Sequence, residues 1–318
     1  MLRDRLRTSA VLIALVLGLL FLDRTVSPPG AEGIWLLPLL LFFTIGTSWE
    51  MATMLRTAGH SIQRGNAVTG AAIIAVSAAV PFLWAISESG YPGDCPIGRL
   101  GWIVLAAVLA IFVILLSEMR DYGREPSVAL GRAIDRTCSS VFVSMYVGIP
   151  MAMLTALRSM HCDSTAGRFG LAALVTMIMV TKVADAGAYF SGRAFGRHKL
   201  IPRLSPGKTI EGAFGGILAS TLVAYLCLSY LFPTIQTPLK TGLSGLLAQP
   251  WLGALVLGPT LAITGMMGDL AESLFKRDSG VKDSGHLLPG LGGVWDVTDS
   301  LIAASVPAFF CFAAGVGG

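Results

Sequence analysis

Charged residues are scarce in this chain of 318 residues: Asp, Glu, Lys and Arg make up 13% of it, whereas a soluble domain has roughly a quarter. The sequence has no CxxC pair, no Cys/His spacing typical of a transition-metal site and no GxxxxGK[ST] phosphate loop. Its net charge is only +4, and the bases are spread over many segments. These absences exclude an ordinary soluble domain and argue against nucleic acid as a partner.

What the chain has instead is apolar sequence. Hydrophobic residues make up 54% of it and the mean hydropathy is +0.71. The apolar segments lack period-two alternation, and backbone in lipid must satisfy its own hydrogen bonds, so we expect helices. The predicted fold is an all-α, polytopic membrane protein with about nine transmembrane helices, near 9–22, 33–54, 67–87, 101–118, 139–157, 168–190, 212–232, 251–271 and 298–316.

The basic residues predict an orientation. If the N-terminus and every second loop are cytoplasmic, 17 of the 23 Lys and Arg residues lie inside and five outside, with Lys182 within a span. The N-terminus is then cytoplasmic and the C-terminus on the outer side. We expect the first helix to be retained rather than cleaved as a signal peptide, and Cys95 and Cys162 to be free thiols, although a disulfide between them is conceivable.

The two halves differ in their charge. Spans in residues 1–160 are almost free of internal charge, so we interpret them as scaffold helices. Residues 161–318 contain every stretch that suggests chemistry, and we predict that they form the catalytic half of a single membrane domain, 1–318.

The first such stretch is KVADAGAYFSGRAFGRHKL, residues 182–200. Lys182 and Asp185 are three residues apart and therefore share a helix face. An ionisable residue is costly in lipid, which indicates a polar cavity wall. A salt bridge that only fixes helix packing is the alternative.

The second stretch is SPGKTIEG, residues 205–212, in a predicted cytoplasmic loop. Ser205 and Thr209 offer hydroxyl groups, and Lys208 offers a positive charge suited to phosphate. Glu211 begins the following helix, where a carboxylate interacts favourably with the helix dipole. We predict a substrate site, with an ordinary capped loop as the alternative.

The third stretch, residues 268–300, combines acids and bases between long apolar runs. Asp269 and Glu272 are three residues apart, as are Asp296 and Asp299. Carboxylates at the ends of two neighbouring helices can meet at one divalent cation that holds a phosphate chain. Bases and a further acid lie between them: Lys276, Arg277, Lys282 and Asp283. A salt-bridged helical hairpin is the alternative.

These residues resemble the signature of the phosphatidate cytidylyltransferase, or CDP-diacylglycerol synthase, family. The signature is S-x-x-K-R-x(4)-K-D-x(5)-P-G-H-G-G-x-x-D-R-x-D, and the residues in register are Ser273, Lys276, Arg277, Lys282, Asp283, Pro289, Gly290, Gly292, Gly293, Asp296 and Asp299. DAGAYFSGRAFG and SPGKTIEG are similar to two further family motifs. The chain departs from the pattern at Leu291, Val297 and Gly207, where the family usually has His, Arg and Lys.

The resemblance implies that CTP and phosphatidate react to give CDP-diacylglycerol and diphosphate at the cytoplasmic face of the inner membrane, with Mg²⁺ as cofactor and a second, monovalent cation by analogy. It implies metal ligands at Asp269, Asp296 and Asp299, and catalytic roles for Lys276, Arg277, Lys282 and Asp283. Substrate-binding roles follow for Lys182, Asp185, Ser205, Lys208, Thr209 and Glu211.

Two other functions stay open on the sequence alone. One is a cytidylyltransferase for another lipid phosphate. The other is a membrane transporter, since broken helices and buried charge also mark transport sites. The chain lacks the DGxxARxxS core of CDP-alcohol phosphotransferases. The sequence leaves a homodimer open.

Overall fold

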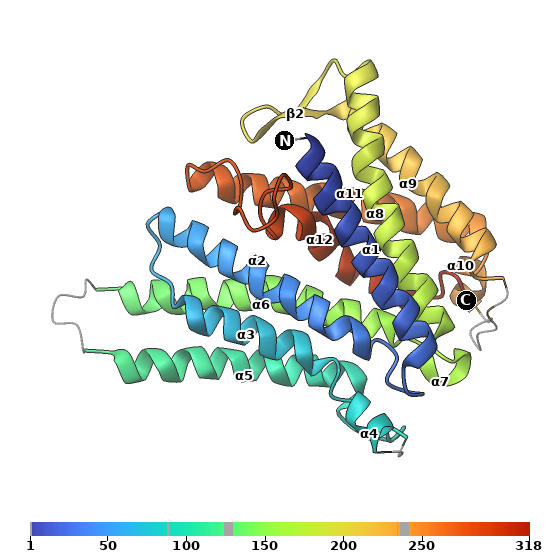
Figure 1. Cartoon of the computed structure of the whole chain (residues 1–318), viewed down its shortest axis with the longest axis horizontal. Helices are drawn as coiled ribbons and strands as arrows, with labels where there is room; N and C mark the ends of the chain where they lie inside the picture. The colour runs from blue at the N-terminus through green and yellow to red at the C-terminus, as the bar shows by residue number, and fades with distance from the viewer. Residues whose placement is uncertain (1, 88–89, 124–129, 234, 236–241) are drawn as a thin grey trace. The chain divides into compact units, whose positions relative to one another are not determined.

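The computed structural model describes residues 2–87, 90–123, 130–233, 235 and 242–318 (Figure 1). The chain divides into two compact units. Unit 1 comprises Met1–Asp23, Gly33–Thr155 and Phe275–Thr298, and unit 2 comprises Arg24–Glu32, Ala156–Leu274 and Asp299–Gly318. The last two long helices therefore each contribute to both units. The prediction of one membrane domain with its halves near residue 160 stays a prediction.

Unit 1 is built from long apolar helices. Helix α2 packs against α3, and α3 packs against α5, with Met51, Ile74 and Ile114 fully or almost fully buried (Figure 1). The Ser144 hydroxyl of α6 donates to the Ala67 carbonyl of α3 at 2.9 Å. The elements are α1 (Leu2–Val26), η1 (Ile34–Leu36), α2 (Leu37–Thr57), α3 (Arg64–Ser77), α4 (Phe82–Ile86), α5 (Gly98–Asp121) and α6 (Arg132–Arg158).

The expected third span, 67–87, is not one continuous helix. Helix α3 ends at Ser77, a turn follows over 78–81, and α4 begins after Pro81. At 1.5 Å per residue, a helix of 14 residues measures only about 21 Å, less than the ~30 Å of bilayer hydrocarbon. The turn is the physical reason why this apolar segment does not count as a spanning helix by itself.

Unit 2 carries a short β-hairpin between two closely packed helices. Strands β1 and β2 are antiparallel, with Lys199 opposite Thr209, and connect α8 to α9. Helices α8 and α9 lie side by side (Figure 1), because small residues such as Gly216 let the backbones approach. The elements are α7 (Cys162–Thr165), α8 (Arg168–Phe195), β1 (Lys199–Ile201), β2 (Ser205–Thr209), α9 (Ile210–Tyr230), α10 (Gly242–Leu247), α11 (Pro250–Asp278) and α12 (Trp295–Ala313).

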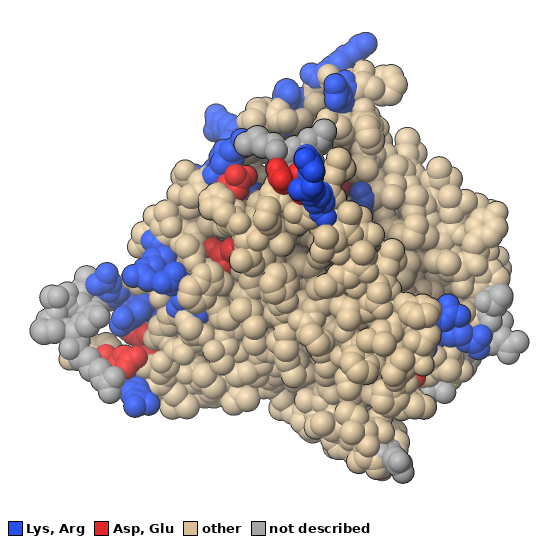
Figure 2. Space-filling model, in the orientation of Figure 1, with Lys and Arg blue, Asp and Glu red and all other residues tan. Residues whose placement is uncertain are grey.

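The predicted all-α, polytopic membrane architecture is confirmed. Among the described residues, eight helices are long and apolar enough to cross a membrane: α1, α2 with η1, α5, α6, α8, α9, α11 and α12. Large apolar side chains face outward on them, for example Val104 and Leu116 of α5, and most of the surface visible in Figure 2 carries no charge. All five cysteines lie among the described residues, and none of them is in a disulfide. Two bases in the orientation count, Arg124 and Lys240, lie outside the described residues.

Candidate active site

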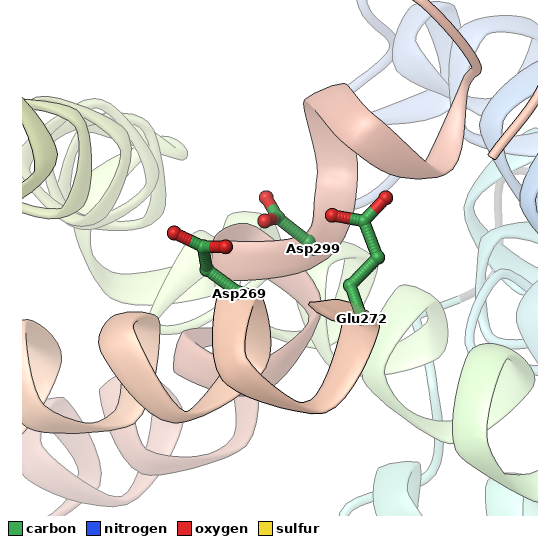
Figure 3. Close-up of side chains that lie close together, drawn as sticks. All are labelled: Asp269, Glu272 and Asp299. Carbon is green, nitrogen blue, oxygen red and sulfur yellow. The ribbon is translucent and has the colours of Figure 1, made fainter. Parts of the chain in front are cut away.

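Three carboxylates of unit 2 lie together at the junction of α11 and α12. Asp269 and Glu272 come from one face of α11, and Asp299 comes from α12. One carboxylate oxygen of each residue lies within 4.8 Å of those of the other two. Figure 3 shows the three side chains converging on the same region. Glu272 and Asp299 are buried and Asp269 is partly exposed, so these oxygen donors fit a hard divalent cation that remains open to a ligand on one side.

Gly268 makes this convergence possible. A Cβ atom at Gly268 would overlap the carbonyl oxygen of Asp299 and lie 2.8 Å from the Cβ of Ala303. The absence of a side chain therefore lets α11 approach α12 at the residue that precedes Asp269. The glycine positions two of the three acids through backbone contact.

A lysine from the β-hairpin stands beside the acidic cluster. The Lys208 ammonium group lies 2.8 Å from Oδ2 of Asp269 and also donates to the Met266 carbonyl at 3.4 Å. The Asp269 side chain is 40% exposed and the Lys208 side chain 22%. Strand β2 thus places a fixed cation at the open side of the cluster, where a phosphate group can contact it.

Five of the predicted site residues line one cavity in unit 2. The cavity has a volume of about 440 Å³, within the ~300–1,000 Å³ range typical of small-molecule sites. The predicted residues that line it are Asp185, Ser205, Lys208, Thr209 and Asp269. Residues that sequence reasoning did not select also line it, among them Tyr189 and Arg193 of α8. The structure therefore brings the DAGAYFSG and SPGKT stretches together around one acid of the cluster.

Lys182 and Asp185 are linked through Ser300 of α12. The Lys182 ammonium donates to the Ser300 hydroxyl at 2.9 Å, and that hydroxyl donates to Asp185 at 3.2 Å. Lys182 and Asp185 are themselves 3.8 Å apart. The Ser300 amide donates to Asp299 at 2.6 Å, so one residue connects the predicted polar wall to the acidic cluster. Ser300 was missed because a serine in an apolar segment carries no distinctive sequence signal.

Glu211 contacts the hairpin rather than the cavity. Its carboxylate accepts hydrogen bonds from the amides of Arg197 and His198 at 3.1 and 3.2 Å, and lies 2.7 Å from Nδ1 of His198. The Thr209 hydroxyl, by contrast, both lines the cavity and caps α9 by accepting from the Gly212 amide. Glu211 thus anchors the β1–β2 hairpin that carries Lys208, and its predicted substrate role stays a prediction.

The remaining predicted residues belong to unit 1. Asp296, at the start of α12, pairs with Lys276 at the end of α11. Its Oδ2 atom also accepts from the Gly293 amide at 2.7 Å and from the Ser284 hydroxyl at 2.8 Å. The other three predicted catalytic residues are exposed: Arg277, Lys282 and Asp283. The described acidic cluster therefore contains Asp269 and Asp299 of the predicted metal ligands and adds Glu272, whereas Asp296 binds the lysine and the loop.

A buried acid of α2 was missed altogether. The Glu50 side chain accepts hydrogen bonds from the amides of Val294 and Trp295 at 2.8 and 2.9 Å. The Ser284 hydroxyl, whose single hydrogen is shared with Asp296, lies 2.9 Å from the same carboxylate. A sequence signal existed, because Glu50 is the only ionisable residue in the apolar segment 33–54.

Known proteins are similar in sequence to this chain. The profile of the cytidylyltransferase family matches residues 3–314. A phosphatidate cytidylyltransferase of Pseudomonas aeruginosa is 34% identical over 321 aligned residues, which cover 100% of this chain and 99% of that protein. One from Haemophilus influenzae is 43% identical over 143 residues, 45% of this chain and 46% of the relative. The uncharacterized protein YnbB of Escherichia coli is 41% identical over 143 residues, 45% and 43% of the two chains.

Proposed function

The chain belongs to the cytidylyltransferase family, and we propose that it transfers the cytidylyl group of CTP to phosphatidate, giving CDP-diacylglycerol and diphosphate. It is a nucleotidyltransferase with many membrane-spanning helices. The observation that carries the proposal is the acidic cluster of Asp269, Glu272 and Asp299 beside a cavity that contains Lys208. Carboxylates next to a fixed cation match the needs of phosphoryl chemistry, in which charge must be offset without covalent help from the protein.

In the proposed reaction, a phosphate oxygen of phosphatidate attacks the α-phosphorus of CTP. A new P–O bond forms to the lipid, and the bond between the α-phosphorus and the oxygen bridging to the β-phosphorus breaks, so that diphosphate leaves with that oxygen. Lys208 contributes a positive charge where the triphosphate enters the cavity. Ser205 and Thr209 offer hydroxyl groups to phosphate or sugar oxygens, and Gly207 and Gly212 line the same cavity.

The family suggests a divalent metal, and we propose Mg²⁺. Asp269, Glu272 and Asp299 would hold it, with the remaining positions filled by water and substrate phosphate oxygens. When bound, it supplies positive charge that stabilises the triphosphate and the departing diphosphate. Asp296 stays a proposed ligand, as does the second, monovalent cation, and Lys276 is proposed to hold a substrate phosphate when released from Asp296.

We further propose that the site faces the cytoplasm from the inner membrane. If α3, the turn and α4 together form one crossing, the chain crosses nine times, with the N-terminus inside and the C-terminus outside. The bias of basic residues toward the hairpin and the loop after α11 supports this orientation, and CTP is available on that side. Phosphatidate reaches the site within the membrane.

The direct test is to incubate the purified protein with CTP and phosphatidate and to measure CDP-diacylglycerol and diphosphate together. Both products should form with added Mg²⁺, stop with a chelator and return when Mg²⁺ is restored. Asp269→Asn should lose roughly 100-fold or more of the rate, while Asp94→Asn, in an exposed loop, should retain it.

A panel of lipid phosphates separates phosphatidate from other acceptors. If diphosphate is released only with a different lipid phosphate, that lipid is the acceptor and phosphatidate is not. Complete absence of CTP-dependent diphosphate release from a folded protein would refute the enzymatic proposal and favour transport.

A further inference from the structure

We propose that Glu50 is a positioning residue for the proposed reaction: from α2 it holds residues 284–295, and through them Asp296 and Lys276, in their working arrangement. The proposal rests on the proposed function and adds to it a residue far away in sequence from every motif. Glu50 is 7% exposed. A buried carboxylate in an apolar helix is costly unless it is fully hydrogen-bonded, so its presence at this place calls for a role.

The carboxylate of Glu50 completes the start of α12. Its Oε1 atom accepts from the Val294 amide and its Oε2 atom from the Trp295 amide. Trp295 is the first residue of the helix and Val294 directly precedes it. N–H groups at the start of a helix have no partner within the helix, and negative charge is favourable there. Glu50 therefore caps α12 from a different helix, and the direction in which α12 begins depends on this carboxylate.

The loop before α12 is shaped around the same carboxylate. A Cβ atom at Gly285 would overlap Oε1 of Glu50, and one at Gly293 would overlap Oε2 of Glu50. Two glycines thus let the main chain wrap closely around the Glu50 side chain. A carboxylate that served only to cap a helix would not require the loop on both sides of it to lack side chains.

The hydrogen bonds continue from Glu50 to Asp296. The Ser284 hydroxyl lies 2.9 Å from Oε2 of Glu50 and 2.8 Å from Oδ2 of Asp296. The amides of Gly293 and Val294 are consecutive in the chain, and the first donates to Asp296 while the second donates to Glu50. Because Asp296 in turn pairs with Lys276, a displaced Glu50 would displace a predicted metal ligand and a predicted phosphate-binding lysine together.

Glu50→Gln tests the proposal. Glutamine keeps the size but presents one amide NH₂ group toward groups that all donate, so one of these hydrogen bonds must break. We expect kcat to fall by about 10- to 100-fold, the usual cost of losing a residue that orients metal ligands, and hydrogen exchange to increase in peptides covering residues 284–295.

Glu118→Gln is the matched control. Glu118 is also a buried glutamate of unit 1, 5% exposed, and it binds Arg136 at 2.7 Å away from the loop. Its replacement should lower the thermal unfolding midpoint as much as Glu50→Gln does, or more, while kcat stays within about 3-fold of wild type and exchange at 284–295 stays unchanged. Ser284→Ala, which removes the shared hydroxyl, should also lower kcat. In the double variant of Glu50→Gln and Ser284→Ala, the fold-loss of kcat should be smaller than the product of the two single fold-losses.

Wild-type kcat in Glu50→Gln would overturn the proposal. So would an equal loss of kcat in Glu50→Gln and Glu118→Gln at equal loss of stability, since the effect would then come from the fold as a whole. Failure of the proposed function is recognised separately, because the wild-type protein would then form no CDP-diacylglycerol, whereas the exchange measurement needs no substrate and still shows whether Glu50 holds the segment.

Discussion

Replacing Gly268 by alanine adds one methyl group at the contact between α11 and α12 in unit 2. The new Cβ would overlap the Asp299 carbonyl oxygen and lie 2.8 Å from the Cβ of Ala303. Carbon atoms in contact normally lie about 3.5–4.0 Å apart, so the two helices must separate by about 1 Å. Asp269 and Asp299, one on each helix, move apart with them.

The separation is large compared with what a metal site tolerates. Mg²⁺ requires near-octahedral oxygen ligands at about 2.0–2.1 Å, and ligand distances in working sites vary by only about 0.2 Å. We therefore expect Gly268→Ala to raise the Mg²⁺ concentration for half-maximal activity by roughly 10- to 100-fold. Overpacking should cost about 1–3 kcal/mol of stability, offset by up to ~1 kcal/mol because alanine favours helix.

The assay is product formation across a range of Mg²⁺ concentrations, together with the thermal unfolding midpoint in detergent. Two other helix glycines provide a graded control. A Cβ at Gly18 meets nothing within 4 Å, and one at Gly265 lies 3.2 Å from the Cγ2 atom of Thr181. Gly18→Ala should show the Mg²⁺ dependence of the wild type. For Gly265→Ala, the Mg²⁺ concentration for half-maximal activity should lie between those of Gly18→Ala and Gly268→Ala. Unchanged Mg²⁺ dependence in Gly268→Ala would refute the reasoning that this contact sets the geometry of the acids.

Three further predictions concern single side chains. Lys208→Met should raise the KM for CTP by about 10-fold or more, because a charge-assisted hydrogen bond to phosphate is worth roughly 1.5–3 kcal/mol, and initial rates at varied CTP measure it; an unchanged KM would remove Lys208 from the nucleotide site. Ser300→Ala breaks the link from Lys182 to Asp185 and should lower kcat by about 10-fold, whereas a change confined to the unfolding temperature would make the link purely structural. Asp296→Asn should lower kcat at saturating Mg²⁺ by roughly 100-fold, and full activity in a folded variant would exclude Asp296 both as a metal ligand and as a necessary partner of Lys276.

The sequence alone predicted the class of fold and the stretches that form the cavity. Long apolar segments with few charges predict membrane helices because the hydrophobic effect and backbone hydrogen bonding act on any such segment. The SPGKT stretch predicted a phosphate-binding element, and the structure places Ser205, Lys208 and Thr209 around one cavity. The sequence did not predict the break in the third span, because the turn at 78–81 interrupts a segment whose composition is apolar throughout.

The arrangement of the acids could not be read in the same way. Spacing by three placed Asp269 with Glu272 on one helix face and Asp296 near Asp299, but it did not say which pairs would converge. The structure groups Asp269, Glu272 and Asp299, and Asp296 receives Lys276 and loop amides instead. That choice depends on the close approach at Gly268, and no local pattern encodes the distance between two helices.

Composition and periodicity thus determined that this chain enters a membrane as helices, and its motifs determined which side chains are available for phosphate chemistry. Tertiary structure decided which carboxylates share a site, that Ser300 connects Lys182 and Asp185 to that site, and that Glu50 holds the loop before α12. The physical reason is the distance along the sequence over which each effect acts. Partition into lipid and helix formation depend on neighbouring residues. A carboxylate cluster, or a cap supplied by another helix, depends on packing between residues as far apart in sequence as Glu50 and Trp295.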